Sequence, residues 1–224
     1  MGNNKTTTGT TTKEGAVVEQ KITKKFVIVI DPGHGDKTEK GWRDPGTHTK
    51  DEKHLECDHV LTLSKAIKES LDTNSDYEVY LTRETDGIVV AKKGPKWKTD
   101  FAAEKNADIL ISMHMDSDSD KGIFTVYQQD KESTEENSKK LGGYINTEIA
   151  SSSFLTSRTD PLRSAKDATR FTTLGVLNGF SGEAAVLIEF GGINSDIVTN
   201  IENESKEIGD IFLKAIDNYY SNRE

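Results

Sequence analysis

The segment FVIVIDPGHGD, residues 26–36, decides the fold of this chain. Its first five residues, Phe26 to Ile30, are an uninterrupted run of apolar and mostly β-branched side chains. This pattern is typical of a strand that is buried on both faces. Pro32, Gly33 and Gly35 follow at once and predict a tight turn directly after the strand.

The same alternation of apolar runs and helical patterns continues outward from this segment. We expect strands over residues 77–83, 107–114, 123–129 and 184–190, and helical segments over 52–71, 101–106, 133–150 and 204–220. The polar stretch 35–51 is expected to be a loop. Strands that alternate with helices in one chain predict an α/β fold, with helices on both faces of a sheet.

The length of 224 residues suits one domain, which we expect over residues 25–224. Residues 1–24 are rich in threonine, lack an apolar period and are expected to form a disordered tail or linker. They contain no apolar core of a secretory signal. Because threonine-rich tethers are common in exported proteins, we expect Met1 to replace a removed signal; the alternative is a protein that stays inside the cell.

The charge and the cysteine content exclude several classes of function. With 29 Lys and Arg against 38 Asp and Glu, the net charge of −9 argues against a nucleic-acid-binding protein. No apolar run is long enough to span a bilayer. Cys57 is the single cysteine, so neither an intrachain disulfide nor a cysteine-based zinc cluster can form. A metal site must therefore use the five histidines and carboxylates.

Polar side chains follow three of the predicted strands. His34 lies in the turn after the first, His114 ends the strand ADILISMH, and Glu189 lies near the end of AAVLIEF. Ligands of α/β sheets bind beyond the carboxyl ends of strands, so these residues could converge on one crevice. Catalytic zinc needs three protein ligands. Glu52, at the expected start of the first helix, is a candidate third ligand, and Glu189 a candidate proton acceptor.

The remaining histidines are expected to be ordinary. His54 and His59 are five residues apart, which on a helix separates them by about 140° around the axis. A metal ion held between them is therefore not expected. His48 lies in the polar loop and is expected to be solvated.

Five segments together resemble, in order and spacing, the zinc-dependent N-acetylmuramoyl-L-alanine amidases of the Amidase_3 type. They are VIVIDPGHGD (27–36), DEKHL (51–55), LTRETD (81–86), ADILISMHMD (107–116) and VLIEFGGINSD (186–196). The resemblance extends from Lys25 to about Asn218. It implies a single α/β domain with a mixed, mostly parallel, twisted sheet of about six strands. It also implies cleavage of the amide between N-acetylmuramic acid and L-alanine in peptidoglycan.

The resemblance also implies roles for individual residues. His34, Glu52 and His114 would hold Zn²⁺ and Glu189 would be the catalytic glutamate, while Glu56, one turn after Glu52, remains the alternative ligand. Candidate substrate contacts are Arg170 and Asp116. A plain surface loop is an equally good interpretation of the segment around Arg170. Lys98 departs from the family, which usually has an arginine there.

Two other functions remain open at this point. One is a catalytically idle member that binds the cell wall or regulates another enzyme, and the other is a different zinc hydrolase such as a polysaccharide deacetylase. The presence of all the proposed residues argues against the first, and the absence of a His-x₃-His pair argues against the second. We expect a location in the cell envelope, periplasmic or extracellular. Because anionic wall polymers would repel this acidic chain, we expect either a targeting or activating protein or the N-terminal tether to bring it to the wall.

Overall fold

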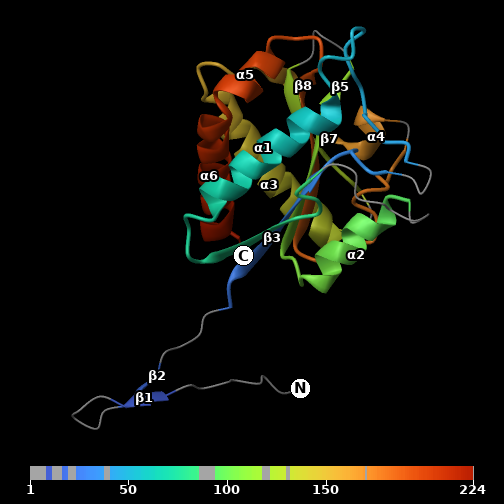
Figure 1. Ribbon diagram of the computed structural model, residues 1–224. Helices are drawn as coiled ribbons and strands as arrows, with labels where there is room; N and C mark the ends of the chain where they lie inside the picture. Colours follow the sequence, from blue (N-terminus) through green and yellow to red (C-terminus); the bar gives the residue numbers. More distant parts are fainter. Residues whose placement is uncertain are drawn as a thin grey trace.

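The computed structural model describes residues 9–11, 17–19, 24–37, 41–85, 94–117, 122–129, 132–169 and 171–223. The strands are β1 Gly9–Thr11, β2 Val17–Glu19, β3 Phe26–Pro32, β4 Tyr77–Leu81, β5 Ile109–Asp116, β6 Ile123–Tyr127, β7 Ser157–Ser164 and β8 Ala184–Gly192. The helices are α1 Glu56–Leu71, α2 Lys96–Glu104, α3 Glu132–Ala150, α4 Ala165–Ala168, α5 Ile197–Asn203 and α6 Ser205–Ser221. Figure 1 shows their arrangement.

A six-stranded sheet in the order β4-β3-β5-β8-β6-β7 forms the centre of the fold. The pairs β3·β4, β3·β5, β5·β8 and β6·β7 are parallel, and β6 pairs with β8 antiparallel. The sheet is therefore mixed and mostly parallel, which confirms the expected α/β fold class.

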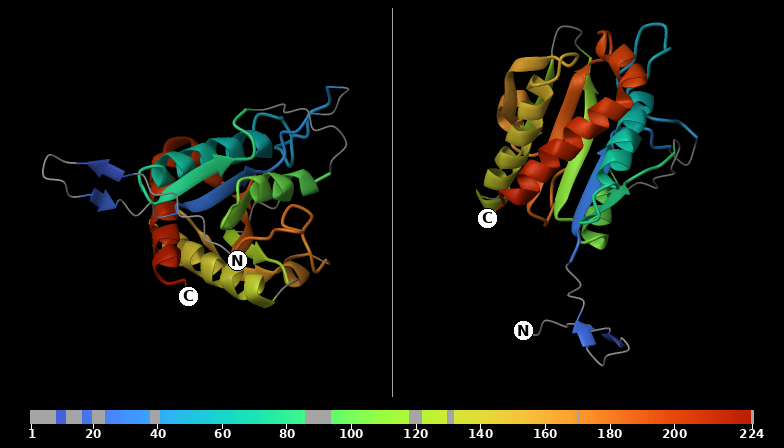
Figure 2. Two further views of the ribbon diagram at one scale, coloured as in Figure 1. Left: turned by 90° about the horizontal axis from the view of Figure 1, so that it is seen from below. Right: turned by 90° about the vertical axis from the view of Figure 1, so that its left-hand side faces the viewer.

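The alternating side chains of the central strands enter two separate cores. On β3, Ile28 and Ile30 pack with apolar residues of α1, α3 and α6, whereas Val27 and Val29 pack against the opposite layer, which includes α2. Burying both faces removes a large apolar area from water, which is the main favourable contribution to folding. Figure 2 shows α1, α3 and α6 together in front of the sheet in its right-hand view.

The structure differs from the sequence prediction in a few elements. Strand β7, SRTDPLRS, was not predicted because it is polar and contains Pro161, features of a strand at the edge of a sheet. Helix α5, which is only one or two turns long, was also missed. The first long helix begins at Glu56 rather than at Glu52.

Most of residues 1–24, the expected tail, lies outside the described residues. Within it, β1 and β2 pair antiparallel with each other in a separate two-stranded sheet. In the part of the chain that is described, no helix is long and apolar enough to cross a bilayer.

Candidate functional site

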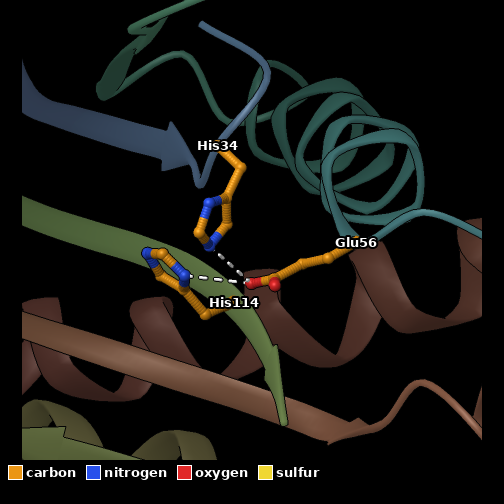
Figure 3. A group of neighbouring side chains, drawn as sticks. All are labelled: His34, Glu56 and His114. Atoms are coloured by element: carbon orange, nitrogen blue, oxygen red, sulfur yellow. Dashed lines mark hydrogen bonds and ion pairs between the residues drawn. The ribbon is translucent and has the colours of Figure 1, made fainter. Parts of the chain in front are cut away.

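His34, Glu56 and His114 converge at the carboxyl edge of the parallel strands (Figure 3). His34 Nε2 lies 3.2 Å from Glu56 Oε1, and His114 Nδ1 lies 3.0 Å from the same oxygen. The two imidazole rings meet edge to face, with centroids 5.0 Å apart. Three side chains from distant parts of the sequence therefore point one ligand atom each at a common point.

His34 is placed by the turn that the sequence predicted after β3. Its backbone has φ of 56°, an uncommon conformation for a residue with a side chain. Asp44 Oδ2 lies 2.9 Å from the Nδ1 atom of His34, which fixes the ring with Nε2 directed at Glu56. At Gly33 a Cβ atom would lie 2.6 Å from His114 Cε1, so only glycine allows the turn to approach His114 so closely.

Glu56, not Glu52, joins the two histidines. Glu56 is the first residue of α1 and is 3% exposed, and its carboxylate accepts hydrogen bonds from the amides of Thr47 (2.8 Å) and Met115 (3.0 Å). Glu52 lies exposed in the turn before α1, with φ of 55°. The structure thus places the alternative carboxylate in the cluster and Glu52 outside it, because the helix begins four residues later than the sequence indicated.

Glu189 is brought next to this cluster by the pairing of β5 with β8. His114 and Glu189 are direct partners in the parallel register. Both carry a buried polar atom, Nε2 of His114 and Oε2 of Glu189, that finds no hydrogen-bond partner among the described residues. A buried polar atom without a partner is costly, so each of these two atoms indicates a site for a ligand, an ion or a reacting group.

The electrostatics of the cluster favour a positive charge at its centre. Burial alone would lower the pKa of His34, but hydrogen bonds and charges from Glu56 and Asp44 raise it to about 9. Burial would likewise raise the pKa of Glu56, and the hydrogen bonds from His114 and His34 hold it well below its usual range. The carboxylate is therefore ionised and attracts a cation.

Glu189 behaves in the opposite way. Burial and the nearby negative charges of Glu56 and Asp116 together raise the pKa of Glu189 to about 8, although His34 acts to lower it. A carboxyl group with such a pKa can hold a proton and release it near neutral pH, which is the property of a general acid or base.

The donor set fits a zinc ion. Two imidazoles and one carboxylate are a known set of ligands for catalytic zinc, which leaves further coordination positions open. The contact of Asp44 with the far nitrogen of His34 is the usual arrangement that orients a metal-bound histidine.

Two buried side chains to which the sequence analysis assigned no function, Arg83 and Lys98, stabilise the segments that carry the site. The Arg83 guanidinium donates hydrogen bonds to the carbonyls of Pro32 (3.1 Å), Gly33 (2.9 Å) and Cys57 (2.8 Å), and so links the His34 turn to α1. Arg83 lies in the LTRETD segment, but nothing in the sequence indicates that it turns inward. In the buried network at the end of β3, Lys98 Nζ lies 2.8 Å from Asp31.

The candidate substrate contacts are placed only in part. Arg170 lies outside the described residues. Asp116 is the last residue of β5, half-buried, and its charge acts on Glu189.

Comparison with known proteins identifies the family and the fold of the chain. The family model described as N-acetylmuramoyl-L-alanine amidase, Amidase_3, matches residues 28–218. A probable N-acetylmuramoyl-L-alanine amidase AmiB from Haemophilus influenzae is 32% identical over 92 residues, which are 41% of this chain and 19% of the relative. The chain thus matches about a fifth of that longer protein.

Solved structures share the fold. An N-acetylmuramoyl-L-alanine amidase from Clostridium difficile 630 superposes with a TM-score of 0.72 at 22% identity, covering 90% of this chain and all of the other. The catalytic domain of CwlV from Paenibacillus polymyxa gives 0.68 at 23%, covering 88% and 98%. The CwlD amidase from Clostridioides difficile, solved in complex with the GerS lipoprotein, gives 0.67 at 21%, covering 88% and 98%. Because the family model spans nearly the whole described domain, the chain belongs to the Amidase_3 family of N-acetylmuramoyl-L-alanine amidases.

Proposed function

We propose that this protein hydrolyses the amide bond between N-acetylmuramic acid and L-alanine in peptidoglycan, with zinc bound at the cluster described above. The observation that carries the proposal is the convergence of His34, Glu56 and His114 beside Glu189, whose Oε2 atom finds no hydrogen-bond partner in the described part of the chain. Membership of the amidase family supports the choice of bond. The donor set supports the choice of metal.

His34, Glu56 and His114 would hold the metal. When bound, zinc lowers the pKa of water and polarises the carbonyl of a substrate amide. Because Glu56 is anchored by two backbone amides and His34 by Asp44, these ligands are held in place before a metal arrives. Such pre-organisation reduces the cost of assembling the site.

Glu189 would transfer the proton. In its ionised form, Glu189 would accept a proton at Oε2 from the attacking water, whose oxygen forms a bond to the amide carbon. It would then deliver the proton to the amide nitrogen, so that the carbon–nitrogen bond breaks and the stem peptide leaves with the amino group of L-alanine free. The products are the carboxylic acid of the muramic acid and the amine of the stem peptide.

A digestion of purified peptidoglycan tests the proposal. The chelator-treated protein is assayed before and after ZnCl₂ is added, and the new amino termini are identified. Zinc is expected to restore the release of stem peptides that begin with L-alanine. Release of acetate would instead show a deacetylase, and the absence of any product would contradict hydrolysis.

The variant Glu189→Gln separates the proton transfer from metal binding. Glutamine matches the neutral, protonated form of this buried side chain, so the fold and the zinc content should remain. Hydrolysis should fall by about 10²–10⁴-fold, the usual contribution of a general acid or base. Glu104→Gln, which makes the same change on the exposed face of α2, should have no effect. Near-normal turnover by Glu189→Gln would refute the assigned role.

The substrate implies a location and a partner. Peptidoglycan lies outside the cytoplasmic membrane, and we infer a periplasmic or extracellular site of action. The net charge of −9 disfavours attraction to a wall with anionic polymers, which supports a targeting or activating protein. Depleting cell-surface proteins before adding the purified chain to walls would show whether such a partner is needed.

A further inference from the structure

A second group of metal-ligating side chains lies outside the candidate active site. It consists of His54, His59 and Glu202, each of which offers one ligand atom within 4.8 Å of the others. His54 precedes α1, His59 lies on its first turns, and Glu202 lies on α5. This group shares no residue with the His34, Glu56 and His114 cluster.

The geometry of the group corresponds to that of a zinc site. His54 Nδ1 lies 3.1 Å from His59 Nε2 and 3.8 Å from Glu202 Oε1. Ligands of tetrahedral zinc, at about 2.0–2.2 Å from the ion, lie about 3.3–3.6 Å from one another. The observed separations fall on both sides of this range, so small side-chain rotations suffice to coordinate an ion.

The expectation that these histidines are too far apart around a helix is wrong, because His54 is not part of the helix. Helix α1 begins at Glu56, and His54 belongs to the extended segment before it. The chain can therefore turn the His54 ring onto that of His59. The two rings stack with centroids 5.2 Å apart and an interplanar angle of 27°.

The three side chains differ in burial. His59 is 7% exposed, and an imidazole binds a metal through its neutral form. The side chains of His54 and Glu202 are 37% and 53% exposed, so that an ion can enter from solvent and complete its coordination with water.

We propose that His54, His59 and Glu202 form a second binding site for Zn²⁺ or a similar transition-metal ion. Two imidazoles and one carboxylate suit zinc rather than calcium or magnesium, which prefer oxygen ligands. The ion would tie α5 to the segment before α1. That segment also positions the active-site carboxylate, because Thr47 donates its amide to Glu56 and His54 accepts a hydrogen bond from Thr49. The site would thus restrain the segment that contacts Glu56.

A zinc titration tests this site without measuring activity. The chelator-stripped protein is titrated with ZnCl₂ in competition with a chromophoric chelator. The wild type should bind two equivalents and His54→Ala one. Glu202→Gln should bind the second equivalent at least about tenfold more weakly. His48→Ala is the matched control, because His48 is exposed and belongs to neither group, and it should bind two equivalents.

The same titration shows which of the two sites holds each equivalent of zinc. His34→Ala should lose one equivalent and keep the one held by His54, whether or not the protein is an amidase. His54 and Glu202 are partly exposed, so that their variants should fold, as circular dichroism can verify. Zinc binding by His54→Ala that equals the wild type in stoichiometry and affinity would overturn the proposal. Anomalous diffraction from a zinc-soaked crystal should place an ion between the three side chains.

Discussion

The two histidine–glutamate groups both include a residue of the first turns of α1, yet they are built differently. In the first, backbone amides and Asp44 hold Glu56 and His34 in place, and the partner strand supplies Glu189. In the second, a loop histidine and a half-exposed glutamate meet the buried His59. Two groups with the same types of side chain therefore need not form equivalent sites. The surrounding fold restrains the side chains of the first group, which suits it to catalysis. The side chains of His54 and Glu202 are partly exposed, which suits the second group to binding a metal ion without catalysis.

The largest effect is expected from the buried network around Asp31, at the end of the strand that leads to His34. Burial alone would raise the pKa of Asp31, but the ion pair with Lys98 and hydrogen bonds from Thr82 and Ser112 lower it. Asp31→Asn leaves the Lys98 charge buried without its partner. The free energy of unfolding should fall by about 3–5 kcal/mol, measured by urea denaturation at pH 7.

The same pair gives a pH dependence with a defined sign. Because the folded-state pKa of Asp31 is depressed, its stabilising contribution is complete above the unfolded pKa of about 3.9 and is lost as the pH falls through the folded value. The wild type should therefore lose stability more steeply than Asp31→Asn as the pH falls below 4. Parallel acid profiles of the two proteins would contradict this account. Asp100→Asn, on the exposed face of α2, serves as the control.

The next effect separates the two candidate carboxylates of the first group. Glu56→Gln should weaken zinc binding by at least about 100-fold, because even residues that only support a ligand contribute 10- to 100-fold. Glu52→Gln should leave the affinity unchanged, since Glu52 is exposed and outside the cluster. Competition titrations at one pH measure both. Equal losses in the two variants would mean that the turn before α1 rearranges when metal binds.

This pair of glutamates also shows how far the sequence could lead. The strand ends that carry His34, His114 and Glu189 were predictable, because each apolar run ends in a polar side chain, which marks the strand and its carboxyl edge. The start of α1 was not, since acidic residues at 52 and 56 both suit a first helical turn. The burial of Glu56 and its contacts with His34, His114 and the amides of Thr47 and Met115 distinguish it from the exposed Glu52.

Long-range packing explains the other gaps. Arg83 is buried because its guanidinium satisfies three carbonyls from two separate segments, and no local pattern in the sequence encodes that. The His54–His59 pair was excluded on an assumed helix, and a shift of the helix start by four residues removed the premise. Strand β7 lies at the sheet edge, where polar residues and a proline are tolerated and the apolar signal is weak.

The smallest effect is expected from a substitution that loosens the ring of His34 without removing a metal ligand. It tests whether restraint of the side chains distinguishes the two groups. Asp44 contacts the Nδ1 atom of His34 at 2.9 Å and is itself no member of the cluster. Asp44→Asn should keep all three ligands but weaken zinc binding by about 10-fold, at the low end for such supporting residues, because Asp44 is partly exposed. Asp100→Asn, which makes the same change on the exposed face of α2, should have no effect. If both variants bind zinc like the wild type, the contact of Asp44 with His34 is not needed to hold the first group in place. The two groups would then differ mainly in how deeply their side chains are buried.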